Sequence, residues 1–419
     1  MKKFRVACQT EVGTVCAVSL LAVLLAVVLI RSLSSAGPER AMVDARHRHA
    51  LIAEVRPAAA RPRLEGCADA KNAEPSESEQ DFVFDVGGRK FRSLQGAVDA
   101  AKDGDTITLT GDAYVRNPVA VRKSLNFDLN GFHLVAKNSK LPRTRRSGRF
   151  AEGSHAITIF GGKQVTVENG FIDVDSNGGA GGFSGAVEVV PDPTVEVAQE
   201  SANDDRNFDT VLRDLEVMTD ASRDAAFRNA EGKMLIDNCT VSSTGGNGSY
   251  TIGQGSETTI RDCEFNTTGT SGECSWWNNT IAVAFDGKTT VESGTYVTRM
   301  AEGVEGTTYG TYVYSSGGSI EVKDGEFQAD QVARADKDMT RFGEEFGASE
   351  VVVKDGTLSG KMVSQQVGLE NGVEAVSGIS AYGGVFDNAP STEQVPEGKA
   401  VVDYGDGTYS VENVARGGR

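Results

Sequence analysis

Apolar and polar positions recur along residues 160–390 in a fixed relation to a shared turn. In Gly318–Phe327 (GSIEVKDGEF), apolar residues lie five and three positions before Gly325 and two positions after it. Two apolar positions separated by one polar residue have the period of a strand with one buried face. The turn position is occupied in six aligned copies by Leu215, Cys239, Cys263, Gly294, Gly325 and Gly356.

The spacing of the copies, 24 or 31 residues, predicts a stacked solenoid, because repeats of this length cannot bury their own apolar face. A second strand signal lies 11 residues before later turns, at Ile252, Val283, Tyr314 and Val373. We therefore expect at least two strands in each coil. The 45 residues between Gly170 and Leu215 leave room for an intervening coil and an insertion at 191–207.

The repeat also predicts where its side chains point. Ile320, Val322 and Phe327 should face the core, and Glu321 and Lys323 should face solvent. Asp324 and Gly325 should form the turn, since Asp before Gly favours tight turns.

A short helix is predicted at residues 93–102, where the repeats begin. Ser93 can cap it, and Leu94, Ala97, Val98 and Ala101 follow a helical spacing. A helix at this place would cover the first coil and keep its edge from pairing with another chain.

The N-terminal part of the chain has a different character. Lys2, Lys3 and Arg5 precede an apolar run from Val15 to Ile30, so residues 1–31 are expected to be a signal peptide or a signal-anchor helix. Residues 32–80 are rich in Ala, Arg, Pro, Glu and Ser and are interpreted as a disordered spacer. We thus expect an exported protein. It is anchored in the membrane by this helix with its body outside the cell, or it is secreted if the leader is cleaved.

Composition supports a turn-rich β protein, with 49 glycines and only 7% aromatic residues in 419. The net charge is −17, and residues 1–65 carry +5, which leaves about −22 for the rest. An acidic body argues against binding of nucleic acid, which needs a basic surface.

Two segments resemble a known family. The stretch FRSLQGAVDAAKDGDTITLTGD followed by KSLNFDLNGFHL (91–112 and 123–134) resembles the entry segment of right-handed parallel β-helix proteins of the pectate-lyase-like group, in particular those on bacterial cell surfaces. The C-terminal ISAYGGVFDNAP and VPEGKAVVDYGDGTYSV are similar to the closing segment of many such proteins. The resemblance implies a right-handed parallel β-helix over residues 81–414. It implies little about activity, since this architecture hosts lyases, hydrolases, tailspikes and adhesins.

Asp or Asn precedes the turn in most coils, for example Asp324 and Asp355, at about one strand spacing (~4.8 Å) from each other. A carboxylate ladder of this kind could bind calcium, as carboxylates do in pectate lyases. Turn chemistry is the favoured interpretation, because calcium needs more oxygen ligands than two such carboxylates supply. No cofactor is therefore expected, with calcium as the alternative.

The neighbouring position alternates in charge, with Arg213, Asp237, Arg261, Glu292 and Lys323 in successive coils. We interpret it as an exposed cross-strand charge ladder rather than a catalytic pair. The four histidines share no metal-ligand spacing, and we identify no catalytic residues.

Cysteines and tryptophans supply the remaining candidates. Cys239 and Cys263 occupy the same turn position in consecutive coils and Cys274 follows, so a disulfide could join Cys239 to Cys263 or Cys263 to Cys274, or the thiols could stay reduced. Trp276 and Trp277 are adjacent, so in a strand they would point to opposite faces. One of them could stack on a sugar ring; alternatively, one is buried in the coil and the other packs beneath a loop.

These observations favour an exported, surface-displayed β-helix with a non-catalytic adhesive, carbohydrate-contacting or structural role. Its expected partners are a carbohydrate or a host or cell-surface ligand. The alternative is a polysaccharide lyase or glycoside hydrolase acting on acidic polysaccharide, which would need clustered carboxylates with Arg or Lys on one face. The sequence leaves open the ligand or substrate, cleavage of the leader, disulfide connectivity and oligomeric state.

Overall fold

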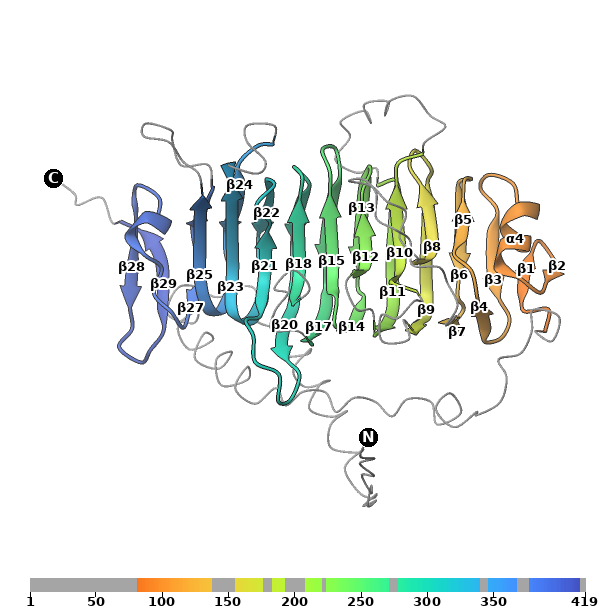
Figure 1. Cartoon of the computed structure of the whole chain (residues 1–419), viewed down its shortest axis with the longest axis horizontal. Coiled ribbons are helices and arrows are strands. Elements are labelled where there is room, and N and C mark those ends of the chain that lie inside the picture. Colours follow the sequence, from red (N-terminus) through yellow and green to blue (C-terminus); the bar gives the residue numbers. More distant parts are fainter. Residues whose placement is uncertain are drawn as a thin grey trace, which may run out of the picture. The chain divides into compact units, whose positions relative to one another are not determined.

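The computed structural model describes residues 81–137, 155–175, 183–192, 208–220, 224–270, 278–339, 346–367 and 377–414. It is an all-β structure with 61% strand and 4% helix (Figure 1). The predicted leader (1–31) and spacer (32–80) lie outside these residues. The described part contains no helix long and apolar enough to cross a membrane.

Parallel strand pairing stacks the chain into successive coils with three strand positions each, which we call the first, second and third sheets. The first sheet is built by β3 (Thr106–Leu109), β6 (Leu125–Asp128), the first parts of β9 (Val165–Asp175) and β11 (Thr210–Thr219), β13 (Lys233–Asp237), β16 (Glu257–Arg261), β19 (Lys288–Val291), β22 (Gly318–Val322), β24 (Ser349–Val353) and β26 (Ser377–Ala381).

The second sheet follows directly after a tight turn in each coil. It is built by β4 (Ala113–Val115), β7 (His133–Lys137), the second parts of β9 and β11, β14 (Thr240–Thr244), β17 (Cys263–Gly269), β20 (Gly294–Met300), the first parts of β23 (Glu326–Asp338) and β25 (Thr357–Val367), and β27 (Val385–Phe386).

The third sheet closes each coil. It is built by β5 (Val119–Val121), β8 (His155–Phe160), β10 (Gly185–Val190), β12 (Ala225–Asn229), β15 (Asn247–Ile252), β18 (Asn279–Ala284), β21 (Tyr309–Val313) and the last parts of β23 and β25. This pairing is consistent with the predicted β-helix solenoid, and it has one more strand per coil than the two that the sequence pattern required.

The prediction of an additional coil between Gly170 and Leu215 is wrong. Leu215 pairs directly with Gly170, because β11 lies beside β9 along both the first and the second sheet. In the chain, the additional residues of this coil precede and follow β10, which runs from Gly185 to Val190 in the third sheet.

A continuous apolar core fills the interior of the described coils. Ile320, Val322 and Phe327 are at most 1% exposed, while the side chains of Glu321 and Lys323 are 39% and 50% exposed, as the repeat pattern predicted. Neighbouring coils stack their aromatic rings inside, with the rings of Tyr296 and Phe327 4.6 Å apart.

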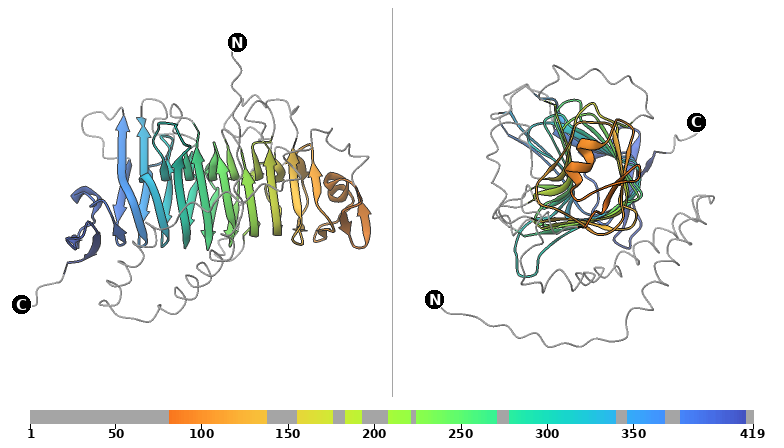
Figure 2. Two further views of the ribbon diagram at one scale, coloured as in Figure 1. Left: turned by 90° about the horizontal axis from the view of Figure 1, so that it is seen from below. Right: turned by 90° about the vertical axis from the view of Figure 1, so that its right-hand side faces the viewer.

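Both ends of the stack carry additional elements. At the N-terminal end, β1 (Phe84–Val86) and β2 (Arg89–Phe91) form a hairpin, and α4 (Leu94–Ala100) lies across the end of the coil (Figure 2). The hydroxyl of Ser93 accepts a hydrogen bond from the Gly96 amide, which confirms the predicted cap. At the C-terminal end, η4 (Thr392–Gln394) precedes the antiparallel hairpin of β28 (Lys399–Asp403) and β29 (Tyr409–Asn413).

Candidate functional site

The Asp and Asn residues that were candidate calcium ligands lie in the turn between the first and second sheets, where their side chains form hydrogen bonds. Asp324 and Asp355 each accept a hydrogen bond from the following glycine amide, at 2.7 and 2.8 Å. In earlier coils, Asn238 donates to Asp214 and Ser293 donates to Asp262 across neighbouring turns. Among the described residues, no group of three or more His, Cys, Asp or Glu side chains is placed to hold a metal ion.

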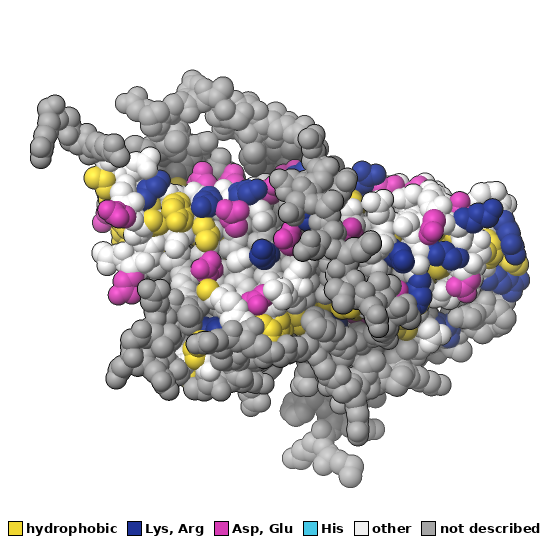
Figure 3. Space-filling model, turned by 90° about the horizontal axis from the view of Figure 1, so that it is seen from above, with side chains coloured by type: hydrophobic (Ala, Val, Ile, Leu, Met, Phe, Trp, Pro, Cys, Tyr) yellow, Lys and Arg dark blue, Asp and Glu magenta, His cyan; other side chains and the backbone are white. Residues whose placement is uncertain are grey.

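The predicted charge ladder is present on the outer face of the first sheet. Arg261 binds Asp237 through two hydrogen bonds of 2.9 and 2.6 Å, and Lys323 lies 3.4 Å from Glu292. The side chain of Arg261 is 43% exposed, so solvent screens this pair. Acidic and basic side chains are likewise interspersed over the face seen in Figure 3.

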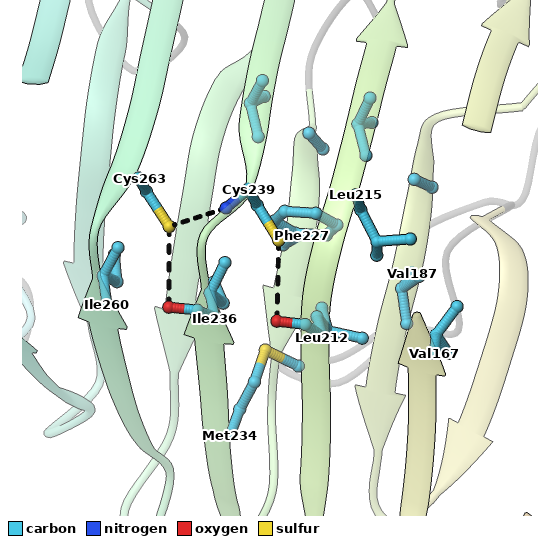
Figure 4. Packing of buried hydrophobic residues seen from close by; sticks show 14 of the residues in the cluster. Val167, Val187, Leu212, Leu215, Phe227, Met234, Ile236, Cys239, Ile260 and Cys263 are labelled. Carbon is cyan, nitrogen blue, oxygen red and sulfur yellow. Dashed lines mark hydrogen bonds between the residues drawn. The ribbon is translucent and has the colours of Figure 1, made fainter. Parts of the chain in front are cut away.

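Cys239 and Cys263 are both free and buried in the structure (Figure 4). Each thiol lies close to a carbonyl oxygen of the preceding coil, Leu212 for Cys239 and Ile236 for Cys263, both at 3.5 Å. Burial and the neighbouring Cys263 raise the pKa of Cys239 well above its ordinary value. Cys274, Trp276 and Trp277 lie outside the described residues, so the Cys263–Cys274 pairing and the sugar-contacting tryptophans stay predictions.

A continuous row of side chains, most of them polar or aromatic, runs along the outer face of the third sheet. Strand register places in one row Thr158, Glu188, Arg228, Tyr250, Ala282, Tyr312, Arg334 and Val363. The adjacent residues Ile157, Val187 and Phe227 belong to the core, so the alternation of a strand turns the row outward. We call this row and the side chains packed on it the outer face of the third sheet.

The N-terminal half of this face is a buried ionic cluster. Glu188, which is fully buried, accepts hydrogen bonds from Thr158 (2.9 Å) and Arg228 (3.2 Å). The Nδ1 of the equally buried His155 lies 3.3 Å from Glu188 Oε2, outside hydrogen-bond geometry, and this contact is an ion pair when His155 is protonated. The Nε2 of His155 lies 3.0 Å from the carbonyl oxygen of Ala225, which fixes the ring.

Each charge in the cluster is stabilised by its partners. Burial alone would raise the pKa of Glu188, but His155 and Arg228 lower it to about 2. Burial alone would lower the pKa of His155, but Glu188 and Asp224 outweigh it, so the pKa is raised. Breaking such a buried set by removing one member leaves uncompensated charge.

The C-terminal half of the face is aromatic. Tyr309, Tyr312 and Tyr314 are about 5% exposed and pack together, with the Tyr309 and Tyr312 rings 5.0 Å apart and nearly parallel. Tyr250 packs edge-on against Tyr314 at 5.7 Å. Phe285 packs against this cluster and makes an edge contact with Phe346 at 5.2 Å. Tyr250, Phe285 and Phe346 are half-buried, so part of each ring faces solvent.

Arg334 lies against the tyrosines as a fixed cation. Its guanidinium is 5.5 Å from the ring centres of both Tyr309 and Tyr312. It donates to both carboxylate oxygens of Asp336 at 2.9 and 3.1 Å, and to Gln365 at 3.1 Å. Burial and Asp336, to which the Tyr312 hydroxyl donates at 2.6 Å, raise the pKa of Tyr312.

The segments outside the described residues occur at equivalent places in the chain. Each one between residues 138 and 376 begins or ends next to a strand of the third sheet: 138–154, 176–182, 193–207, 221–223, 271–277, 340–345 and 368–376. The turns from the first to the second sheet carry none of them.

Sequence reasoning identified the turn and the charge ladder but missed this face. A usable signal was a charged residue that directly follows apolar or small residues in a third-sheet strand, as Glu188 does in GAVEVV and Arg228 in AAFRN. Comparison of the chain with protein-family models, with curated proteins and with solved structures finds no match.

Proposed function

We propose that the protein is an exported, surface-displayed β-helix of the pectate-lyase-like group that contacts carbohydrate without catalysis. The single observation that supports this is the aromatic half of the outer face of the third sheet. Carbohydrate is the ligand expected there, because ligand sites combine aromatic surface with a few well-placed polar groups.

The side chains that a ligand would meet are the partly exposed ones. Tyr250, Phe285 and Phe346 offer ring surface, and Arg334, whose side chain is 17% exposed, offers a cation beside them. A cation at this place suits a sugar that carries a carboxylate. Trp276 and Trp277, the sugar-contacting residues that the sequence predicts, lie one residue before β18 in the chain.

A non-catalytic role is favoured by the charge states on this face. General acid–base catalysis works best with a pKa near the operating pH. Glu188, with a pKa lowered to about 2, stays ionised, and Tyr312, with a raised pKa, stays protonated. Both therefore suit a fixed scaffold of charges and hydrogen bonds better than proton transfer.

The proposal also includes export of the chain and its attachment to a membrane through the N-terminal segment. The apolar run Val15–Ile30 after three basic residues supports an anchor or cleaved leader, and residues 32–80 would hold the body off a bacterial membrane. The acidic, repetitive body suits display outside the cell.

Binding to a panel of neutral and uronic-acid-containing polysaccharides, measured by calorimetry, tests the proposal. Tyr250→Ala and Phe346→Ala should each weaken binding about fivefold or more, as loss of a ring contact of about 1–3 kcal/mol would predict. Tyr382→Ala is the matched control, because Tyr382 is 39% exposed but lies at the end of the first sheet against Lys354. Absence of binding to every polysaccharide would overturn the carbohydrate proposal and leave a structural role.

The same panel, assayed with and without calcium for new reducing ends or unsaturated sugars, tests the lyase or hydrolase alternative. Product released by the wild type and lost in Glu188→Gln or Arg228→Met would establish an enzyme instead. Asp324→Ala and Arg261→Ala serve as controls, since Asp324 forms the turn and Arg261 belongs to the exposed ladder.

A further inference from the structure

The turn between β18 and β19 places a phenylalanine in an unfavourable backbone conformation. Phe285 has a φ of 53° and Asp286 a φ of 62°, and the Gly287 amide donates a hydrogen bond to the Ala284 carbonyl at 3.1 Å. Two successive residues with positive φ inside such a hydrogen bond form a turn of type I′, which favours Asn and Gly. A bulky side chain in this conformation is strained.

The fold does not by itself require an aromatic residue in this turn. The described residues include seven non-glycine residues with positive φ, and six of them are Asn or Asp. Phe285 is the seventh, although Asn would form the turn with less strain. Its ring packs on the tyrosine cluster and meets Phe346 edge-on, and it stays partly exposed. Strain that is retained at a partly exposed ring points to a function of that ring.

The second ring of this pair, Phe346, is fixed from two other coils. Asp286, at the start of the β19 coil, accepts at Oδ1 a hydrogen bond of 2.7 Å from the Gly347 amide, although the two residues are 61 positions apart in the chain. Lys337, which is only 1% exposed, donates from Nζ to the carbonyl oxygens of Phe346 and Gly347, both at 2.8 Å. Burial lowers the pKa of Lys337, and the nearby Asp286 opposes that effect.

Gly317, in the coil between Asp286 and Gly347, leaves room for this contact. The Asp286 amide donates to the Gly317 carbonyl at 3.2 Å. A Cβ at Gly317 would lie 2.7 Å from Asp286 Oδ1 and 2.7 Å from the Gly347 carbonyl oxygen, so a side chain there would push the two apart. The φ of 88° at Gly317 also favours glycine. Three successive coils therefore determine where the Phe346 ring lies.

We propose that Asp286 and Lys337 are positioning residues that hold Phe285 and Phe346 as a preformed aromatic corner for a sugar ring. The two ring centres are 5.2 Å apart and their planes are inclined by 70°. Rings that are already held in place lose little conformational freedom on binding, which favours affinity. The corner contacts C–H groups of the sugar, so it should serve neutral and uronic-acid sugars alike. This inference rests on the proposed carbohydrate-binding function.

Fluorine NMR of the full chain in detergent tests the positioning without a ligand, with a fluorine-labelled phenylalanine in place of Phe346. The resonance should narrow and move towards that of the free amino acid in Asp286→Ala and in Lys337→Met. Asp286→Asn should rescue the wild-type resonance, because Asn keeps an acceptor oxygen and tolerates positive φ. Asp262→Ala is the matched control, since Asp262 has a φ of 52° and accepts from Ser293 at 2.8 Å outside the third sheet. A resonance that Asp286→Ala and Lys337→Met leave unchanged would overturn the inference.

Calorimetry with polygalacturonate and with its methyl ester tests the effect on binding, because the two probes differ only in the charge of the carboxyl group. Asp286→Ala and Lys337→Met should each weaken binding about twofold to tenfold, by the same factor for both probes. Asp286→Asn should restore the wild-type affinity. If the wild type binds and these variants bind equally well, this inference alone fails. If the wild type binds neither probe nor any other polysaccharide, the proposed function fails with it.

Phe285→Asn separates a binding role of this ring from a packing role. Because Asn suits the turn, the variant should be about as stable as the wild type in chemical denaturation. It should nevertheless bind polygalacturonate about fivefold or more weakly, since it lacks the ring. Unchanged affinity, with or without a loss of stability, would assign Phe285 to packing and overturn the inference.

Discussion

At the residue scale, the turn between the first and second sheets has one backbone conformation in the earlier coils and another in the later coils. In earlier coils the residue before the turn position takes a left-handed conformation, with φ of 63° at Asn169, 51° at Asn238 and 52° at Asp262. From Gly294 onward the turn residue itself is glycine with φ between 102° and 135°. Asn and Asp tolerate the first conformation, whereas only glycine adopts the second without strain.

Gly325→Ala should therefore destabilise the protein by about 1–3 kcal/mol. Besides the strained φ of 135°, the new Cβ would lie 3.1 Å from the Gly294 carbonyl and 3.2 Å from the Phe327 ring. Gly378→Ala is the matched control, since no atom lies within 4 Å of its Cβ and its φ is not positive. Chemical denaturation measures both. Equal stability of the two variants would contradict the account of the turn.

The buried cluster around Glu188 predicts a pH-dependent stability. His155 has a folded pKa above its ordinary 6.5, so its contribution is full below pH 6.5 and is lost as the pH rises through the folded pKa. Glu188 has a pKa lowered from 4.5 to about 2, so its contribution is present above pH 4.5 and is lost as the pH falls towards 2. Stability should be greatest between these limits.

Denaturation from about pH 2 to about pH 9 checks both limits. His155→Gln should lower stability at pH 6 and remove the decline on the alkaline side. Glu188→Gln should cost about 3–5 kcal/mol at neutral pH, because it removes a buried negative charge that stabilises His155 and Arg228. Arg261→Met is the control for a solvent-screened pair and should cost less than about 1 kcal/mol. A wild-type alkaline slope that survives in His155→Gln would show that another group is responsible.

At the element scale, the strands of the three sheets differ in how well sequence predicts them. The outer face of the first sheet contacts solvent, so the buried residues Ile320 and Val322 alternate with the solvent-facing Glu321. This alternation can be recognised in the sequence. Strands of the third sheet, such as β8 and β10, are buried on both faces, and their alternation is hidden. His155, Glu188 and Arg228 meet only because coils of unequal length stack in register, which no local pattern encodes. This is why the fold was predictable and the candidate site was not.

On the outer face of the second sheet, glutamate and threonine alternate from coil to coil. One outer row reads Glu216, Thr240, Glu264, Thr295, Glu326 and Thr357 in consecutive coils. Each glutamate is separated from the next by a threonine, so no two carboxylates lie directly opposite across a strand pair. Like charges in that position are destabilising. An acidic body can thus stack its coils without adjacent repulsion along this row.

The helix α4 offers a test of how the stack is capped. Gln95→Ala should destabilise the protein by about 1–3 kcal/mol, because it removes the partner of both the amide and the carbonyl of Ala120. Asp99→Ala is the control, since Asp99 only accepts an exposed hydrogen bond from Gln95. Hydrogen exchange of β5 should accelerate in Gln95→Ala and stay unchanged in Asp99→Ala. Unchanged exchange of β5 in both variants would mean that α4 does not stabilise this edge through Gln95.

For the whole molecule, the stacked architecture predicts local rather than global responses. In the described coils, each strand pairs with the equivalent strands of the neighbouring coils, so damage in one coil is transmitted through nearest-neighbour contacts. Phe127 in β6 and Phe327 in β23 are both buried in the same continuous core but lie near opposite ends of it. They are therefore two comparable sites at which to test how far a local disturbance spreads along the stack.

Phe127→Ala and Phe327→Ala should each cost about 3–5 kcal/mol, since both remove a fully buried ring. Hydrogen exchange should then differ in location. In Phe327→Ala, faster exchange should centre on β20, β23 and β25, because Phe327 stacks on Tyr296 and pairs with Leu358. In Phe127→Ala, it should centre on β3, β6 and β9. A uniform rise over the whole body in both variants would instead identify one cooperative unit, in which stability at the outer face of the third sheet depends on every coil.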